Sequence, residues 1–378
     1  MLDPETLSML RKQVSECVVT DRALLDVLLE EITPLEHSQH RIHPRSTTSV
    51  SMVGTDGGNN ELRFDPFLVQ IIRVVDSNRN ELWLEVVTPT TKVAELNARH
   101  FVDDRPTSPL GRMMDALGIR SVADLSFMLR DGTEKKPRSP SWINVYREVT
   151  EWAILLDMTK KDYGSDTLII FDGFLRSKVF KGTLFKRYGE LLSEAIEKQK
   201  RNRRNIYIVG LAKHSAVLAR YRLALKIKRI LRGSYPCYVK ISRELEEKAY
   251  VWSEYARGRG DEDDGGEAAK FVNGVMFFVK FGNRPHDAIW PVDLFEPQAD
   301  QAQTAFGYLV KDAEEGFPVS VYPRSLQKAH EAAALFGLDM DLLQDVVTDG
   351  VRTMLGTGAH VLDEFALEPV DPSQTRYR

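Results

Sequence analysis

The sequence predicts an α/β protein in which helices cover the faces of a mixed β-sheet. Short apolar runs of strand length follow one another early in the chain, at Ser49–Gly54, Phe67–Val75 and Leu82–Val87. Two later runs, Thr167–Phe171 and Ile206–Leu211, alternate with segments of helical period. With 378 residues, 43% of them hydrophobic and 28% charged, the chain has the size and composition of one large globular domain or two.

Residues 1–47 are predicted to form an N-terminal helical arm. Apolar residues recur there at helical spacing up to about residue 33, and Pro34 ends the pattern. The polar stretch that follows contains three histidines, but no cysteine or carboxylate cluster accompanies them, so a loop is favoured over a metal site. The apolar positions are Leu7, Leu10, Val14, Val18, Leu24, Leu25 and Leu28, and the histidines are His37, His40 and His43.

An antiparallel meander is predicted next, followed by an insertion. Turn residues around Asp76–Asn78 separate the second and third early strands, so these runs are expected to pair as hairpins. Residues 94–140 carry only short helical patterns, at Leu110–Leu117 and Val122–Leu129. Because no long flexible linker bounds residues 94–140, we interpret them as a helical insertion rather than a separate domain.

The second half of the chain completes the predicted sheet. A helix from about Ser141 to Lys161 precedes the strand Thr167–Phe171, and basic helices follow, the second of them at Ser215–Leu231. The order β-β-β-α-β-α-β-α is that of RNase H-like sheets, and active sites of such α/β sheets lie near the carboxyl ends of central strands.

We therefore predict one domain over residues 48–378, with residues 337–378 as a C-terminal helical extension. Within this domain, a mobile acidic loop at Asp261–Gly266 precedes a strand at Phe271–Phe281. Residues Gly316–Ala332 read as a strand that runs into a helix, with Pro323 in the first helical turn.

Several classes of protein are excluded by simple features. No apolar run approaches the ~18 residues that span a bilayer, and the N-terminus lacks the pattern of a signal sequence, so we expect a cytoplasmic protein without a membrane segment. Cys17 and Cys237 are too few for a disulfide framework or a thiolate zinc site. No phosphate loop of the Walker type is present, which argues against an ATPase.

The net charge of −4 conceals a strongly basic segment. From Arg176 to Arg232 there are 17 Lys or Arg residues and three acidic residues, so this segment carries +14 and the remainder of the chain about −18. A solvated helix face is one interpretation. However, the acidic residues that would form i,i+4 pairs are nearly absent, which favours a surface that meets a polyanion such as nucleic acid.

Two Asp-Gly motifs are the candidates for chemistry. Asp56 follows the apolar run of the first early strand in Asp56-Gly57-Gly58, and Asp172 follows Leu168–Phe171 in Asp172-Gly173. A carboxylate at the end of a buried strand needs a partner, and hard oxygen ligands favour Mg²⁺ or Mn²⁺. Asp-Gly is also the commonest turn dipeptide, so either motif alone can mark only a turn.

Additional ligands are available on two helices. Glu148 and Glu151 share one face of the helix before Asp172, and Glu151 lies closer to the edge of its packed stripe, although both can simply be solvated. His330 follows Pro323 by two helical turns, and Tyr322 precedes it. Either of these residues can instead be structural.

With these motifs the chain resembles the NurA-type nucleases, which process DNA ends together with the hexameric HerA translocase. The resemblance spans about residues 48–336. It rests on Asp56-Gly57-Gly58, on a helical glutamate before Phe171-Asp172-Gly173, on Leu211-Ala212-Lys213-His214-Ser215, and on Gly316-Phe317-Pro318 leading to Tyr322 and His330. Gly58 departs from the family, which often has serine there.

The resemblance implies a site and its cofactor. Asp56, Glu151 and Asp172 would bind catalytic Mn²⁺, with Mg²⁺ as an alternative, in an RNase H-like core, and Tyr322 and His330 would complete the site. His330 would bind metal or donate a proton, and its imidazole favours Mn²⁺. Basic side chains would track the DNA backbone with little sequence preference. We assign this contact to Lys213, Arg176, Lys178, Arg203, Arg204 and Arg220.

The function implied is that of a metal-dependent deoxyribonuclease. It would hydrolyse phosphodiester bonds by a two-metal mechanism, as a 5′–3′ exonuclease and single-strand endonuclease, in double-strand break end resection and repair. A homodimer and a HerA-type ATPase partner are implied as well. The alternatives are a non-catalytic DNA-binding adaptor on the same fold and an RNA-directed nuclease.

Overall fold

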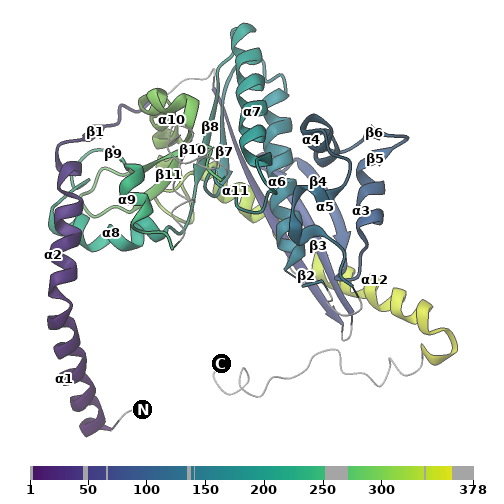
Figure 1. Cartoon of the computed structure of the whole chain (residues 1–378), viewed down its shortest axis with the longest axis horizontal. Helices are drawn as coiled ribbons and strands as arrows, with labels where there is room; N and C mark the ends of the chain where they lie inside the picture. Colours follow the sequence, from purple (N-terminus) through teal and green to yellow (C-terminus); the bar gives the residue numbers. More distant parts are fainter. Residues whose placement is uncertain are drawn as a thin grey trace.

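A nine-stranded mixed sheet runs through the molecule, with helices packed on both of its faces (Figure 1). The computed structural model describes residues 3–45, 50–64, 67–133, 138–139, 141–251, 271–335 and 338–359. The strand order is β1-β9-β10-β11-β8-β7-β2-β3-β4. This architecture confirms the predicted α/β class, with a mixed sheet flanked by helices.

The elements have the following bounds. The sheet contains β1 (Gln39–Arg41), β2 (Val50–Phe64), β3 (Phe67–Asp76), β4 (Glu81–Val87), β7 (Asp166–Asp172), β8 (Ile206–Leu211), β9 (Cys237–Lys240), β10 (Gly274–Lys280) and β11 (Ile289–Phe295), and β5 (Phe101–Val102) pairs separately with β6 (Arg105–Pro106). The helices are α1 (Pro4–Thr20), α2 (Arg22–Glu31), α3 (Val93–His100), α4 (Pro109–Leu117), α5 (Val122–Leu125), α6 (Trp142–Lys160), α7 (Leu184–Arg201), α8 (Ala216–Ile227), α9 (Arg243–Glu247), α10 (Ala302–Glu314), α11 (Arg324–Ala333) and α12 (Leu338–Leu355). Short 3₁₀ helices are η1 (Thr33–Glu36), η2 (Phe127–Leu129) and η4 (Glu296–Gln301).

Five strands form the half of the sheet that was predicted. β2, β3 and β4 are an antiparallel meander, and β7 and β8 follow as strands parallel to β2. After β4 the chain passes through residues 88–141 to α6, which leads into β7. The helix α7 then connects β7 to β8. The predicted meander, the helix before β7 and the strand Ile206–Leu211 are therefore confirmed.

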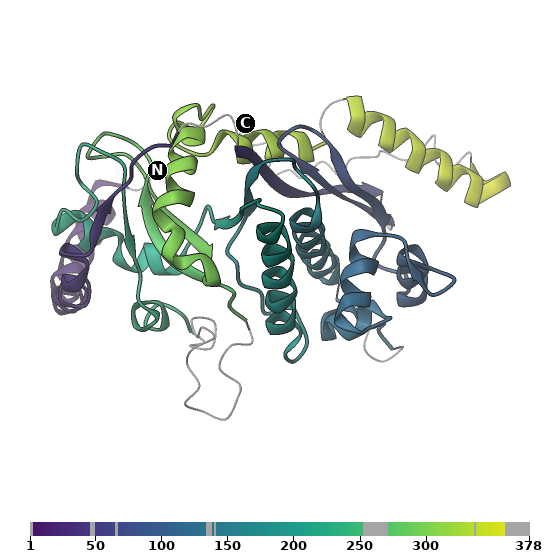
Figure 2. The same ribbon diagram turned by 90° about the horizontal axis from the view of Figure 1, so that it is seen from above.

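Side chains of β7 alternate between two hydrophobic cores. Ile169 and Phe171 lie in the core shared with α6 and α7, where Trp152 stacks on Phe171 with ring centroids 4.5 Å apart. Leu168 and Ile170 lie in the core beneath α10 and α11. The two helical layers thus cover opposite faces of the sheet, and Figure 2 shows the α6–α7 pair on one side of β2 and α11 on the other.

The remaining strands were largely missed by the sequence analysis. Its single predicted strand Phe271–Phe281 corresponds to β10, but this strand pairs with β9 on one side and with β11 on the other. β11 contains Pro291, which is unusual inside a sheet, and β9 has only four residues, so neither matches a typical strand pattern. β1 includes His40, so the histidine-rich stretch predicted as a loop is partly a strand.

The N-terminal arm is two helices separated at Asp21, and α1 extends away from the body (Figure 1). After α2 the chain enters a third core through Ile32 and Leu35, next to α8. The predicted insertion contains α3, α4, α5 and η2, of which α4 packs against α6. The domain boundaries themselves stay a prediction. No helix among the described residues has the length and apolar character needed to cross a membrane.

Two local predictions were wrong. β2 does not end before Asp56 but continues as a long hairpin with β3 as far as Phe64. No strand precedes α11 within the described segment 302–335, because residues 315–322 form a loop held by side chains of α11 and β11, and Pro323 is the N-cap of α11. The acidic loop Asp261–Gly266 lies outside the described residues.

Candidate metal and DNA site

The two aspartates of the Asp-Gly motifs lie at the same level of two neighbouring parallel strands, β2 and β7. The pairing of β2 with β7 ends at Thr55 opposite Phe171, so Asp56 and Asp172 each follow the last paired residues. Beyond this point β2 pairs only with β3, with Asp56 opposite Val75. The two motifs therefore come together because β2 runs beside β7. Asp56 itself lies inside β2 and not at the end of the strand.

Asp172 is held by a lysine. The Lys213 Nζ donates to Asp172 Oδ2 at 2.7 Å, and the two side chains are 42% and 15% exposed. Asp172 pairs in register with Leu211, and Lys213 follows that residue by two. An ammonium group thus contacts the carboxylate at the place where a metal-binding role would put a cation.

The helix α11 lies over β2, β3 and β7 on the same side of the sheet as the second core. Its buried stripe includes Ser325, Leu326, Ala329 and Ala333, and His330 is exposed beside that stripe. Arg73 of β3 anchors the helix end by donating from Nη1 to Ala332 O at 2.7 Å. His330 is therefore on the helix that covers the strands of both Asp-Gly motifs.

The glutamates of α6 approach this edge of the sheet from the opposite face. β7 rises about 20 Å over its length, and a helix covers the same rise in about 13 residues, which brings Glu148 and Glu151 close to the level of Asp172. Ser177, in the loop after β7, donates from Oγ to Glu148 Oε1 at 2.5 Å, and burial raises the Glu148 pKa. Glu151 contacts Arg147 at 3.6 Å.

Tyr322 is a packing residue in this structure. Its ring is 4% exposed, belongs to the second core and lies 4.6 Å from the Trp290 ring, centroid to centroid. Because α11 begins two residues later, the ring fixes the start of the helix that carries His330.

The donor set suits a hard or borderline divalent cation. Carboxylate oxygens with an added imidazole are ligands that fit Mn²⁺. The Lys213 side chain that contacts Asp172 is 42% exposed, so it can move into solvent when a metal ion takes its place. Among the residues whose side chains the structure describes, no group of three His, Cys, Asp or Glu has metal-binding geometry. The side chain of Asp56 is outside that set.

The predicted DNA-contacting residues do not form one surface. Lys178 and Lys213 are exposed near the carboxyl ends of β7 and β8. Arg203 and Arg204 precede β8, about 20 Å away at the opposite edge of the sheet, and Arg204 pairs with Asp162. Arg220 of α8 binds Glu31 of the arm, with Nη2 and Oε2 3.2 Å apart. Lys178 and Lys213 are thus the exposed, DNA-accessible candidates next to the strand end that carries Asp172.

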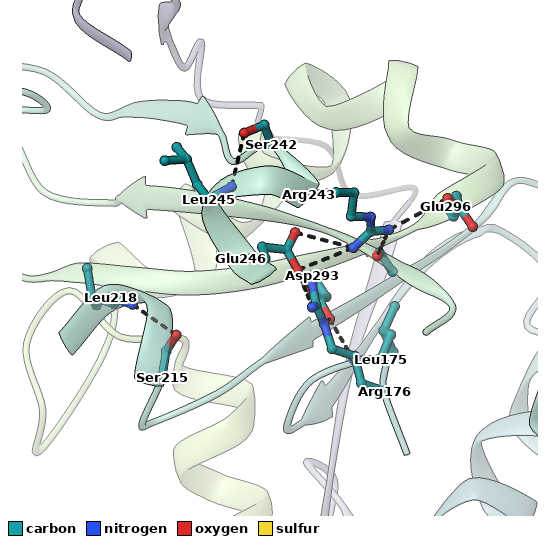
Figure 3. Close-up of polar contacts among 11 residues, drawn as sticks. Leu175, Arg176, Ser215, Leu218, Ser242, Arg243, Leu245, Glu246, Asp293 and Glu296 are labelled. Atoms are coloured by element: carbon teal, nitrogen blue, oxygen red, sulfur yellow. Dashed lines mark hydrogen bonds and ion pairs between the residues drawn. The ribbon is translucent and has the colours of Figure 1, made fainter. Parts of the chain in front are cut away.

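Arg176 is buried and cannot contact DNA, which corrects its assignment to the DNA-contacting set. Its guanidinium has no exposed surface, pairs bidentately with Asp293 at 2.8 and 2.9 Å, and also binds Glu246 (Figure 3). Burial opposes its charge, but Asp293 and Glu246 outweigh that effect and raise the Arg176 pKa well above its ordinary value. Asp293 additionally accepts from Leu175 N at 3.1 Å.

No local sequence pattern assigns a role to Asp293, Glu246 or Ser177. Asp293 lies 117 residues after Arg176, inside the apolar run of β11. An acidic residue within an apolar strand was the only local sign that Asp293 has a buried partner. Together these contacts fix the course of the chain immediately after Asp172.

No protein-family model matches the chain, and no curated protein matches it. Among solved structures, it is similar to the NurA nuclease from Sulfolobus solfataricus at 11% identity, with 92% of this chain and 98% of that chain covered and a TM-score of 0.43. A second NurA structure matches at 12% identity, with 99% and 100% covered and a TM-score of 0.39. A NurA bound to dAMP and manganese matches at 12% identity, with 90% and 96% covered and a TM-score of 0.36. Each of these three solved structures is that of a NurA protein.

Proposed function

We propose that this protein is a metal-dependent deoxyribonuclease of the NurA type. The observation that carries the proposal is the adjacent register of Asp56 and Asp172 in parallel strands, together with the Lys213 ammonium 2.7 Å from Asp172. Carboxylates that meet at one sheet edge can hold the divalent ions that metal-assisted phosphodiester hydrolysis uses. The order β4-β3-β2-β7-β8, with β2, β7 and β8 parallel, supports an RNase H-like core.

The residues divide into metal-holding and DNA-holding groups. Asp56, Asp172, one glutamate of α6 and His330 would hold Mn²⁺ or Mg²⁺, which when bound polarises the phosphodiester and lowers the pKa of water. Lys213 would release Asp172 and bind a phosphate oxygen as a point charge. Lys178, exposed in the loop after β7, would add a second phosphate contact with little sequence preference. Tyr322 would position α11 through its packing.

The finer features of the proposal follow the family resemblance. They are a two-metal mechanism, 5′–3′ exonuclease and single-strand endonuclease activity, double-strand break end resection, a homodimer and a HerA-type ATPase partner. The predicted cytoplasmic location agrees with such a role. The resemblance alone supports these features.

The test compares two isosteric variants at opposite ends of β7. Asp172→Asn removes the carboxylate beside Lys213, and Asp166→Asn changes a carboxylate that binds Asn205 at the other end. End-labelled single- and double-stranded DNA is incubated with Mn²⁺, Mg²⁺ or EDTA. We expect cleavage with Mn²⁺ to fall roughly 100-fold or more in Asp172→Asn, as when one catalytic electrostatic group is removed, and to persist in Asp166→Asn. Equal activity in both variants would contradict the proposal.

The choice between the two glutamates can be tested in the same assay. Glu151 is the predicted ligand, but Glu148 has the described contact to the loop after Asp172. Glu148→Gln and Glu151→Gln are therefore measured side by side, and the variant that loses Mn²⁺-supported cleavage while it keeps DNA binding identifies the ligand.

A non-catalytic DNA-binding adaptor is the second candidate. The observation that favours it is the ion pair itself, in which Lys213 supplies Asp172 with a counter-charge from the protein. This alternative predicts no cleavage with any metal, no Mn²⁺ binding, and salt-sensitive DNA binding that Asp172→Asn leaves intact.

A further inference from the structure

The loop between α10 and α11 presents an aromatic ring to solvent. Phe317 is 81% exposed, more than any other aromatic side chain in the described part of the chain. Full burial of a phenylalanine is worth about 1.5–3 kcal/mol, so an exposed ring forgoes a large stabilisation. Its neighbour Val319 is 48% exposed.

This loop is nevertheless firmly built. The Gln327 side chain of α11 accepts from Val319 N at 2.8 Å and donates to Val319 O at 2.9 Å and to Tyr322 O at 3.0 Å. Trp290 Nε1 donates to Val321 O at 3.1 Å. Two side chains from different elements therefore fix the backbone that carries Phe317.

Two backbone features add to this rigidity. A Cβ on Gly316 would lie 2.3 Å from Tyr322 O, so only glycine fits where the two ends of the loop meet. Val321 has a φ of +51°, a strained conformation for a β-branched residue, which persists only where the surroundings enforce it. Phe317 is thus presented by a preorganised loop.

The register places this loop at the candidate site's edge of the sheet. Leu211 pairs with Asp172 on one side and with Val292 on the other. Ala212 N donates to Pro291 O at 3.3 Å, and Trp290, which holds the loop, is the preceding residue of β11. The loop therefore lies at the edge where Asp172 meets Lys213, and it leads directly into the helix that carries His330.

We propose that Phe317 stacks on an unpaired nucleobase of a DNA strand whose backbone passes Asp172 and Lys213. This inference rests on the proposed function and adds the residue that would hold an unpaired base beside the site. An aromatic ring stacks on any base, whereas paired bases in a duplex already cover one another's faces. Two exposed cations, Arg324 and Lys328, lie in the first two turns of α11 next to the loop and would meet the strand's phosphates. Arg324 would exchange its contact with Glu315, whose Oε2 lies 2.6 Å from Arg324 Nη1, for a phosphate.

The test measures DNA binding without cleavage, in Ca²⁺. Phe317→Ala removes the ring, Phe317→Trp keeps a stacking surface, and Phe127→Ala removes a 60% exposed ring elsewhere. We expect Phe317→Ala to weaken single-strand binding about 5- to 150-fold, the range for loss of one stacked base. Duplex binding and the salt dependence should not change, because no phosphate contact is lost. Phe317→Trp and Phe127→Ala should bind as the wild type does.

A fluorescent base analogue reports stacking directly. Quenching of 2-aminopurine by the wild type and by Phe317→Trp, with loss of quenching in Phe317→Ala, would support the inference. Unchanged single-strand binding in Phe317→Ala would overturn it and leave Phe317 to a protein contact. If the wild type fails to bind or cleave DNA, the proposed function itself fails. If it cleaves with Mn²⁺ and Phe317→Ala binds equally well, only the stacking role fails.

Discussion

Two ion pairs flank the end of β7 and have the same chemistry in opposite surroundings. Asp172 and Lys213 meet at 2.7 Å with 15% and 42% of their side chains exposed. Four residues later, Arg176 meets Asp293 at 2.8 Å with both side chains fully buried. Arg176 also binds Glu246, which in turn pairs with Arg243, so the buried pair is part of a larger ion network (Figure 3).

The difference in burial determines which of these charges can exchange partners. Water can replace either member of the exposed pair, so a metal ion or a phosphate can compete for Asp172 or Lys213 at low cost. The buried pair cannot separate without leaving an uncompensated charge in the core. The same loop therefore holds an exchangeable carboxylate at its start and a fixed anchor behind it.

The largest effect is expected when the buried pair is broken. Asp293→Ala leaves Arg176 buried with Glu246 alone and removes the acceptor of Leu175 N, so the free energy of unfolding should fall by about 3–5 kcal/mol. Asp172→Ala, which breaks the exposed pair, should cost at most about 1 kcal/mol. Urea unfolding in metal-free buffer measures both. Equal losses would contradict the distinction between the two pairs.

The second largest effect is expected from the pH dependence of stability, through the buried histidine His100. His100 is fully buried between Ser108 Oγ at 2.7 Å and Tyr146 Oη at 2.6 Å, and burial lowers its pKa from 6.5 to about 4. Between these values the unfolded chain binds a proton that the folded chain does not. The stabilisation is therefore complete above pH 6.5 and declines as the pH falls to 4, by about 3 kcal/mol.

Paired variants isolate this histidine from other titrating groups. The unfolding free energy of His100→Gln should fall less steeply between pH 6.5 and pH 4 than that of the wild type. His214→Gln changes an exposed histidine and should keep the wild-type slope. A parallel decline in all three proteins would show that His100 does not contribute.

Local pattern was enough to predict one half of the sheet. The run Ile206–Leu211 is fully buried and matches β8 at both ends, and the helix predicted from about Ser141 to Lys161 matches α6. The failures concern contacts between distant residues. Counting charges assigned Arg176 to a basic surface, because nothing near it in sequence reveals that Asp293 and Glu246 enclose it.

The local geometry around the candidate site differs from the prediction. The Asp-Gly motifs were read as strand ends, but β2 continues past Asp56 because β3 pairs with it there. Val319, Val321 and Tyr322 alternate as in a strand, yet Gln327 and Trp290 satisfy their backbone groups and hold a loop instead. Side-chain acceptors and donors from other elements are not visible in a local pattern.

A smaller effect is expected when the buried pair is crowded rather than broken. A Cβ on Gly274 would lie 2.8 Å from Asp293 Cβ and 3.0 Å from Asp293 Oδ2. Gly274→Ala should therefore displace Asp293 and lower the unfolding free energy by about 1–3 kcal/mol. Gly350→Ala in α12 meets nothing within 4 Å and should be neutral or gain up to about 1 kcal/mol. Similar results for the two variants would argue against a tight fit around Asp293.

The smallest effect on stability is expected at the exposed pair, where the effect on binding is the informative one. Lys213→Gln should change the unfolding free energy by less than about 1 kcal/mol, since the Lys213 side chain is 42% exposed and the glutamine amide can still donate a hydrogen bond to Asp172. It removes both a competing cation from Asp172 and a positive charge from the site, so Mn²⁺ should bind several-fold more tightly when measured by calorimetry without DNA. DNA binding should weaken, with a salt slope reduced by about one, because one phosphate contact is lost. If Mn²⁺ affinity falls instead, Lys213 supports the metal site rather than competing with it. In that case the exposed pair would be a fixed structural element like the buried one.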